Sequence, residues 1–289
     1  DLSSAEGSAS GLVEGDIRRH AEALEGRVRK RYRHWRRRFE REGTGVFRLY
    51  DWDVPEVRAV VDWYDGHATV AEYARRQSDV AGYLDALVAA VARATDVPVE
   101  HVHPRRRRTG RERYERFSSE SLRHVVREQG LRFIVNLTDY VDTGLFADHR
   151  LTRRLVEGMS EGKRVLNLYG YTGAFTCYAA RGGAAETFTI DQSGTYLDWA
   201  KENLELNGLH AARHRLLRAE AKEWLEAAHE RGELFDVIVL DPPSRSTLGG
   251  FRGGNFDILR DHSPLLDVTS ELLAPGGQLV FSTNHQRFE

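Results

Sequence analysis

The chain has 289 residues, of which 40% are hydrophobic and 10% aromatic, enough for real cores in one large or two medium domains. Its formal net charge is only -2, so the total charge indicates neither a polyanion partner nor an acidic disordered protein. The single cysteine, Cys177, excludes an internal disulfide and a thiolate metal site, and no apolar run has the length of a membrane span or resembles a signal peptide. These features are typical of a globular cytoplasmic enzyme.

The first part of the chain predicts a linker and a long basic helix. Residues 1–15 are rich in Ser, Gly and Ala and have no periodicity, which predicts a linker. Apolar residues then recur at helical spacing from residue 16 to about residue 42. Arginines crowd the other positions of this helix, with Arg36 and Arg37 among them. RNA phosphate binding by this cluster, and a solvated face paired with nearby glutamates, fit the pattern about equally well.

The remainder of residues 16–143 predicts an α+β subdomain that binds RNA. Strand-like runs cover residues 46–50, 57–64 and 67–73, a helix follows over residues 80–94, and shorter strands lie near residues 99–103, 124–127 and 133–135. A second basic cluster, Arg105, Arg106, Arg107 and Arg108, has no acidic balance, so we expect it to bind nucleic acid. His101 and His103 have no partners at metal-ligand spacing, so we expect them to be strand residues and expect no metal site.

Residues 144–289 alternate strands and helices, the pattern of a parallel sheet covered on both faces. The predicted strands are residues 164–169, 186–190, 214–219, 235–240 and 278–282. Ser193 is placed to begin the helix after the second strand, and Asn207 with Gly208 is placed to end it. An α/β fold of the Rossmann-like type follows from this order.

The most informative motif is the strand and turn over residues 165–175. Asn167 to Gly173 form the first strand-to-helix turn of the predicted sheet, where small residues let a ligand approach, and Asp191 ends the next strand about twenty residues on. A carboxylate there can bind the two hydroxyls of a ribose. The turn lacks the third glycine of the dinucleotide-binding motif, which favours S-adenosylmethionine. A tight turn without a ligand, and an N-cap role for Asp191, are the alternatives.

The loop after the fourth predicted strand, Asp241-Pro242-Pro243, points to methyl transfer. Two prolines stiffen the backbone and leave carbonyls free to accept from a base edge, and Asp241 can take an amino or ring proton. Glu220 follows the third strand, where it can contact adenine or simply begin a helix. Cys177 lies within a predicted helix, so methylation of carbon through a thiolate adduct is disfavoured.

Several blocks closely resemble the RlmK half of the bacterial RlmKL-type 23S ribosomal RNA methyltransferases. They are residues 136–150, 166–173, 195–200, 203–208 and 241–243, together with the early runs 48–51 and 70–73. The resemblance covers nearly the whole chain. It implies a class I methyltransferase fold, S-adenosylmethionine as cofactor and methylation of guanine N7 in 23S ribosomal RNA. It also implies an RNA substrate before full assembly and an upstream domain that methylates guanine N2.

The residue patterns and the resemblance together define the expected site. The cofactor turn comprises Asn167, Tyr169, Tyr171, Thr172 and Gly173, with Asp191 on the ribose, Glu220 on adenine, and Asp148 and Arg150 between cofactor and RNA. Asp241, Pro242 and Pro243 would hold the guanine. The chain departs from the family pattern at Glu220, where the family usually has Asp, and over residues 244–250, and we expect the C-terminal strands of the sheet to be missing. The alternatives are methylation of guanine N2 or adenine N6, and a non-catalytic RNA-binding or ribosome-assembly module.

Overall fold

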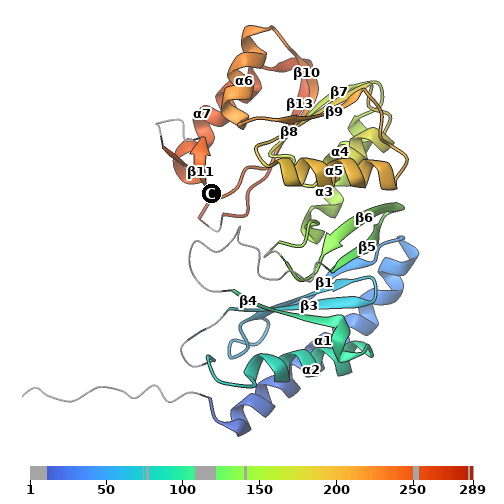
Figure 1. The fold of residues 1–289 in the computed structure, drawn as a ribbon, viewed down its shortest axis with the longest axis vertical. Coiled ribbons are helices and arrows are strands. Elements are labelled where there is room, and N and C mark those ends of the chain that lie inside the picture. Colours follow the sequence, from blue (N-terminus) through green and yellow to red (C-terminus); the bar gives the residue numbers. More distant parts are fainter. Residues whose placement is uncertain are drawn as a thin grey trace, which may run out of the picture. The chain divides into compact units, whose positions relative to one another are not determined.

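The computed structural model divides into two units, which are described separately (Figure 1). The described residues are 12–73, 75, 78–107, 122–139, 142–249, 254–285 and 287–288. The first unit comprises residues 1–130 and 135–143, and the second comprises residues 131–134 and 144–289. No helix in the described ranges combines the length and apolarity that a membrane crossing needs.

The first unit is a four-stranded sheet with two helices on one face (Figure 1). Its strands, in spatial order, are β1 Val46–Asp51, β2 Ala59–Tyr64, β3 His67–Tyr73 and β4 Val102–Arg107, and its helices are α1 Glu14–Arg41 and α2 Tyr83–Thr95. The first three strands pair antiparallel, whereas β3 and β4 pair parallel. A 3-10 turn, η1 Val99–His101, precedes β4, and β5 Arg123–Glu128 pairs with β6 Leu131–Asn136.

The core of this unit explains why α1 is a helix. Leu24, Val28, Tyr32 and Phe39 recur at helical spacing and are buried against the sheet, with Phe39 stacked on Phe47 at a centroid distance of 4.7 Å. The predicted helix over residues 16–42 is confirmed, with its start two residues earlier, at Glu14. At the other end, Gly43 with φ +62 stops it.

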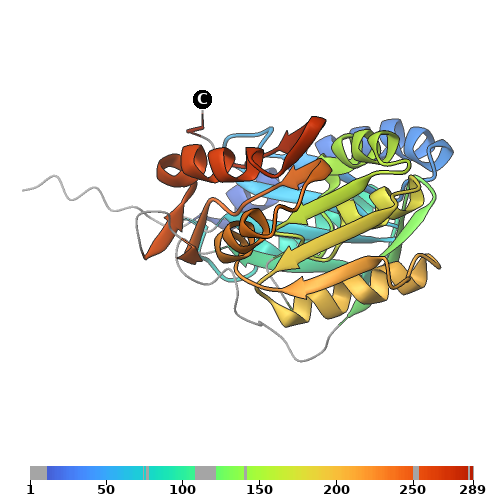
Figure 2. The same cartoon turned by 90° about the horizontal axis from the view of Figure 1, so that it is seen from above.

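The second unit is a five-stranded parallel sheet covered on both faces, and Figure 2 shows its strands side by side. The strands, in spatial order, are β13 Leu273–Phe281, β10 Phe235–Leu240, β7 Arg164–Leu168, β8 Glu186–Asp191 and β9 His214–Arg218. The helices are α3 Arg150–Met159, α4 Ala174–Arg181, α5 Gly194–Leu206, α6 Ala221–Glu230 and α7 Ile258–Ser270, with the 3-10 turn η3 Ala147–His149 before α3. All five predicted strands are confirmed, and the sheet is of the Rossmann-like type.

One hairpin of the second unit was not predicted. β11 Arg245–Gly249 pairs antiparallel with β12 Asn255–Asp257 directly after the Asp-Pro-Pro loop. Phe256 on β12 is buried in the core of the unit, so the hairpin is anchored by an apolar side chain. Its backbone returns to the loop, because the Ile258 N–H donates to the Ser244 carbonyl at 3.1 Å.

Candidate active site

The centre of the second sheet is a topological switch point. Leu168 at the end of β7 is paired in register with Leu240 of β10 on one side and with Ile190 of β8 on the other. The chain runs from β7 to β8 and later returns to the opposite side of β7 at β10, and ligands bind outside strand ends at such a point. The residues that follow these three strands, 169–173, 191 and 241–243, therefore lie together at one edge.

The two glycines of the turn are required by packing inside the protein. A Cβ on Gly170 would lie 2.2 Å from Cγ2 of Thr189, and a Cβ on Gly173 would lie 2.7 Å from Cβ of Ala200. Gly173 also has φ +72, a conformation that favours glycine. We expected small residues there to make room for a ligand. On the Cβ side of both glycines the space is filled by Thr189 of β8 and Ala200 of α5, and the room for a ligand stays a prediction.

Two residues predicted for the cofactor turn use their side chains within the fold. Asn167 is buried, and its Nδ2 donates to Oγ1 of Thr176 at 3.0 Å. Thr172 is also buried and donates from Oγ1 to the Gly144 carbonyl at 2.6 Å, while Nδ2 of Asn203 donates to the Thr172 carbonyl at 2.9 Å. These bonds fix the path of the turn. A ligand would therefore contact Asn167 and Thr172 through their backbone atoms, and their cofactor role stays a prediction.

Asp191 ties the turn to the end of β8. Its Oδ2 accepts from the Tyr171 N–H at 2.9 Å and its Oδ1 from the Ser193 N–H at 2.8 Å. Burial raises the pKa of this carboxyl, although both backbone hydrogen bonds oppose the shift. Ser193, not Asp191, is the N-cap of α5, because its Oγ accepts from the Tyr196 N–H. Asp191 is thus free of the capping role that was its alternative.

Aromatic rings flank the turn. The ring of Tyr171 meets that of Tyr196 edge to face at 4.5 Å and lies 5.6 Å from that of Phe146. Tyr169 lies on the other side, 6.3 Å from Phe256, and its pKa is raised by burial and by nearby carboxylates. Both tyrosines of the turn have left-handed backbone, with φ +55 and +49. The turn is an apolar, strained segment, as binding loops often are.

Glu220 begins a helix, which was the alternative to adenine binding. It is the N-cap of α6, where its Oε2 accepts from the Glu223 N–H at 3.0 Å. Glu220 follows β9, and the last residue of β9, Arg218, is paired in register with Asp191 of β8. Its adenine contact stays a prediction and would use its other oxygen. Asp148 is exposed on η3 and Arg150 is the first residue of α3, so the two lie on consecutive elements.

Asp241 is held by two partners that sequence reasoning missed. Ser282 donates from Oγ to Asp241 Oδ1 at 2.6 Å, and Nε2 of His149 lies 3.6 Å from Asp241 Oδ2. The His149 ring packs edge to face on Phe175 at 5.7 Å, which links the loop to α4. His149 lies between Asp148 and Arg150 in the block that carries the resemblance, and that position was the available signal.

The predicted RNA contacts are divided by the structure. Arg36 pairs with Glu40 at 2.8 Å and lies over the Tyr32 ring, whereas Arg37 is exposed. Arg105 donates to the Asn136 carbonyl at 3.0 Å, so that guanidinium is partly used by its own unit. The side chains of Arg106 and Arg107, and all of Arg108, lie outside the described residues.

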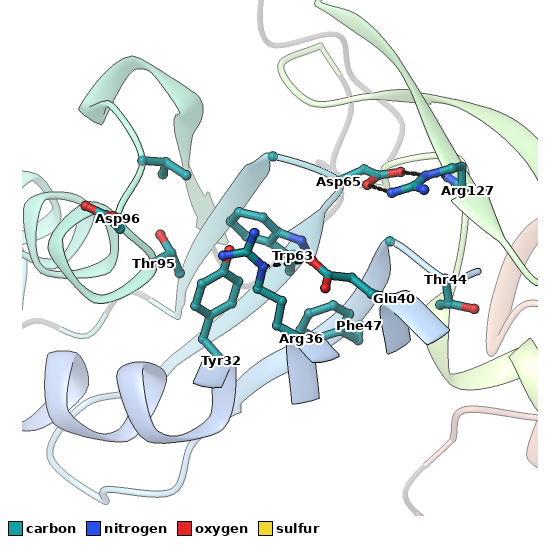
Figure 3. A pocket seen from close by; sticks show the side chains of 13 residues that line it. Tyr32, Arg36, Glu40, Thr44, Phe47, Trp63, Asp65, Thr95, Asp96 and Arg127 are labelled. Atoms are coloured by element: carbon teal, nitrogen blue, oxygen red, sulfur yellow. Dashed lines mark hydrogen bonds and ion pairs between the residues drawn. The ribbon is translucent and has the colours of Figure 1, made fainter. Parts of the chain in front are cut away.

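A cavity of about 390 Å³ lies in the first unit (Figure 3). Tyr32, Trp63 and Phe47 form its aromatic side, and the Asp65 and Arg127 pair, 2.7 Å apart, closes one rim. It contains none of the residues predicted for the cofactor. It is therefore separate from the edge of the second sheet that carries Asp191 and Asp241.

Four histidines gather at one end of the first sheet. The ring of His67 stacks on His101 at 4.3 Å and on His103 at 5.3 Å, and lies 4.5 Å from His124. Burial, with the neighbouring histidines, lowers the pKa of His67 and of His103 to about 4. No group of metal-ligating side chains within the described part of the chain has the geometry to hold an ion. His101 and His103 are therefore members of a cluster, which sequence spacing did not indicate.

Comparison with known proteins identifies the family to which the chain belongs. The profile of a family described as S-adenosylmethionine-dependent methyltransferase matches residues 48–288. The chain belongs to this family. The sheet is accordingly a Rossmann-like class I methyltransferase sheet, and S-adenosylmethionine is the cofactor of the family.

The methyltransferase is similar to longer curated relatives and to solved structures. It is 44% identical to the ribosomal RNA large subunit methyltransferase K/L of Allochromatium vinosum over 90% of this chain, and 43% identical to that of Methylococcus capsulatus over 93%. The chain spans 36% and 37% of the length of these two relatives. A methyltransferase structure solved with SAH aligns with a TM-score of 0.76 at 25% identity, over 92% of this chain and 68% of that one.

The residues at the sheet edge of this methyltransferase fit a nucleoside cofactor. An ionised carboxylate offers about four acceptor sites, and the two backbone N–H groups on Asp191 occupy one on each oxygen. Two sites remain for a ribose diol. The lone cysteine, Cys177, is buried in α4 and burial raises its pKa to about 12, so it supplies no thiolate.

Proposed function

We propose that this chain methylates N7 of a guanosine in large-subunit ribosomal RNA. The observation that carries the proposal is the register of β10, β7 and β8, which brings Asp241, the Tyr169–Gly173 turn and Asp191 to one edge at the switch point. The names of the relatives supply the substrate class. Cofactor groups would meet Asp191 and the turn, and the base would meet Asp241, Pro242 and Pro243.

The proposed reaction requires alignment of the reactants and no general base. S-adenosylmethionine supplies, when bound, an electrophilic methyl group on a sulfonium. Guanine N7 attacks with a lone pair that carries no proton, so no side chain has to remove one. Alignment alone can lower a barrier by about 7 to 11 kcal/mol. The two prolines after Asp241 suit this demand because they restrict the backbone beside the base.

Asp241 is prepared as a hydrogen-bond acceptor for the base. The Ser282 hydroxyl fixes one of its oxygens, and His149 stands on the side of the other. A guanine presents ring and amino N–H donors on the edge away from N7. We propose that Asp241 accepts from those donors, so that N7 turns toward the methyl group.

Mass spectrometry of the product tests this function. The chain is incubated with S-adenosylmethionine and large-subunit RNA stripped of protein, the RNA is digested to nucleosides, and the methylated nucleoside is identified. The expected product is 7-methylguanosine, and an Asp241→Ala variant should lose at least tenfold in rate, since a charged hydrogen bond contributes about 1.5 to 3 kcal/mol. Methylation at guanine N2 or adenine N6 would replace the proposal with an amino-group reaction. Failure to bind the cofactor would favour a non-catalytic RNA-binding module.

The length of the relatives bears on the wider context. Because the chain spans little more than a third of them, the upstream guanine-N2 methyltransferase domain expected from the resemblance is part of this proposal. So is action before the large subunit is fully assembled. Comparing stripped RNA with intact subunits as substrates tests the second point, and equal rates on both would contradict it.

A further inference from the structure

Helix α1 carries two kinds of cation, which differ in their partners. Six arginines of α1 form ion pairs with acidic side chains: Arg18, Arg19, Arg29, Arg31, Arg36 and Arg38. Five other cations, which we call the basic stripe, are exposed and have no ion pair with any residue that the structure describes: Arg27, Lys30, Arg33, Arg37 and Arg41. The pairing is therefore selective, and it leaves one set of charges unbalanced.

The basic stripe lies on one face of the helix. At 3.6 residues per turn its members fall within an arc of about 120°, on the side away from the buried Leu24, Val28 and Tyr32. Its length, from Arg27 to Arg41, is about 21 Å at 1.5 Å per residue. Helix α1 thus presents a band of cations on one face, while the formal charge of the whole chain is only -2.

This arrangement costs stability in the free protein. Arg33 and Arg37, and likewise Arg37 and Arg41, stand four residues apart, and like charges at that spacing destabilise a helix by about 0.2 to 0.5 kcal/mol per pair. Elsewhere on the same helix that spacing holds ion pairs, as between Arg18 and Glu22. A bound polyanion would turn the repulsion into attraction.

We propose that the basic stripe binds the phosphate backbone of RNA, outside the methyl-transfer site. The proposal rests on the proposed function for its choice of RNA. Four of the five cations are arginines, whose planar guanidinium matches phosphate oxygens. Binding through phosphates gives affinity and orientation without reading sequence. Arg37 belongs to this surface, whereas Arg36 is retained by Glu40.

Salt-dependent RNA binding tests the proposal. The triple variant R33Q/R37Q/R41Q is compared with wild type by fluorescence anisotropy, in the absence of cofactor, on a labelled single strand and on a labelled hairpin between 50 and 200 mM KCl. The expected result is at least tenfold weaker binding at low salt. The slope of log affinity against log salt should fall by about 2 to 3, since each lost phosphate contact removes about 0.7 on single strands and 0.9 on duplex. The RNA that the wild type binds more tightly at equal salt identifies the form bound.

A charge-matched control separates this surface from general electrostatics. The variant R18Q/R19Q/R38Q removes the same charge from the same helix but only from ion-paired positions, and it should keep the wild-type slope. Thermal unfolding of R33Q/R37Q/R41Q should occur at or above the wild-type temperature, because repulsion is relieved. Equal slopes for both variants, or a wild type that binds no RNA, would overturn the proposal. The methylated nucleoside is identified separately, so a wrong target atom would leave this binding result standing.

Discussion

At the scale of single residues, Asp191 has two tasks that one carboxylate can combine. It fixes the turn by accepting from the Tyr171 N–H, and it fixes its own loop by accepting from the Ser193 N–H. Its remaining acceptor sites are the reason for the proposed contact with the ribose. A neutral amide at this position keeps one oxygen for one of the two backbone N–H groups and loses both the charge and the second acceptor oxygen.

Asp191→Asn should weaken S-adenosylmethionine binding by about tenfold to a hundredfold, the effect of about 1.5 to 3 kcal/mol lost from hydrogen bonds to a charged group. Isothermal titration calorimetry measures this. Ser193→Ala is the matched control: it removes the cap of α5, which costs about 1 kcal/mol of stability, and should leave the affinity within threefold. Unchanged affinity in Asp191→Asn would mean that the ribose is bound elsewhere.

Gly173→Ala should lower the free energy of unfolding by more than the strain of a left-handed residue alone. The new Cβ would meet Cβ of Ala200 at 2.7 Å, and φ is +72. Gly208→Ala is the control, because Gly208 has φ +67 with nothing within 4 Å of an added Cβ. We expect a loss of about 1 kcal/mol in the control and of about 2 to 4 kcal/mol in Gly173→Ala, measured by urea unfolding. Equal losses would show that the turn moves to accept the methyl group.

Sequence reasoning located residues better than it explained them. Asp191 and Asp241 were found because strand ends in a parallel sheet face the same edge. The glycines have a second reason that the sequence does not show, since the contacts of Gly170 and Gly173 with Thr189 and Ala200 depend on how α5 and β8 pack. His149 was missed because its partner Asp241 is far away in sequence.

At the scale of elements, the histidine cluster joins β3, η1, β4 and β5. Arg105 acts electrostatically on His103, and Nε2 of His124 is hydrogen-bonded to the backbone carbonyl of Asp65. The cluster therefore has cationic and polar neighbours. Protonation of His67 would place a charge between stacked rings. The cluster therefore makes this unit sensitive to acid.

Stability of the first unit should fall as the pH drops from about 6.5 toward 4. The pKa of His67 and His103 is about 4 in the folded chain, against 6.5 without burial, so the unfolded chain takes up protons first. The stabilisation is present above pH 6.5 and is lost through this window. Urea unfolding across the window measures it. His67→Gln should flatten the slope, whereas His34→Gln, on an exposed histidine of α1, should not, and parallel slopes for all three proteins would contradict the prediction.

Elements with regular apolar patterns were predicted well. The strands of the second sheet are short apolar runs between turn residues, and α1 has a clear helical stripe. The pair β11 and β12 was missed because residues 244–257 contain four glycines and two serines but three apolar residues, an unusual composition for strands. Among the described side chains of the hairpin, Phe256 is the one that lies in the core of the unit. Its pairing comes from the tertiary fold, which local propensity does not encode.

At the scale of the whole molecule, residues 131–134 belong with the methyltransferase unit although they precede it in sequence. Asn203 Oδ1 accepts from the Ile134 N–H at 2.9 Å, and Asn207 Oδ1 accepts from the Arg132 N–H at 2.8 Å. The indole N–H of Trp199 donates to the Ile134 carbonyl at 3.0 Å. The predicted division after residue 143 left these residues with the first domain.

A fragment of residues 131–289 should therefore be more stable than one of residues 144–289. The shorter fragment loses the partners of Asn203, Asn207 and Trp199, and each net hydrogen bond contributes about 0.5 to 1.5 kcal/mol. Thermal unfolding of the two purified fragments measures the difference. A third fragment, 131–289 with Asn203→Ala, should fall between them. Equal melting temperatures for the first two would show that residues 131–134 contribute nothing to this unit.

The left-handed backbone of Tyr169 and Tyr171 bears on the cost of ordering the turn when a ligand binds. Tyr169 and Tyr171 hold a conformation that costs an L-residue about 1 to 2 kcal/mol, and Asp191 accepts a hydrogen bond from the Tyr171 N–H. If this contact holds the turn before the cofactor binds, ordering the turn takes nothing from the binding free energy. Hydrogen exchange at the Tyr171 amide should already be slow without cofactor, and adding cofactor should change it little.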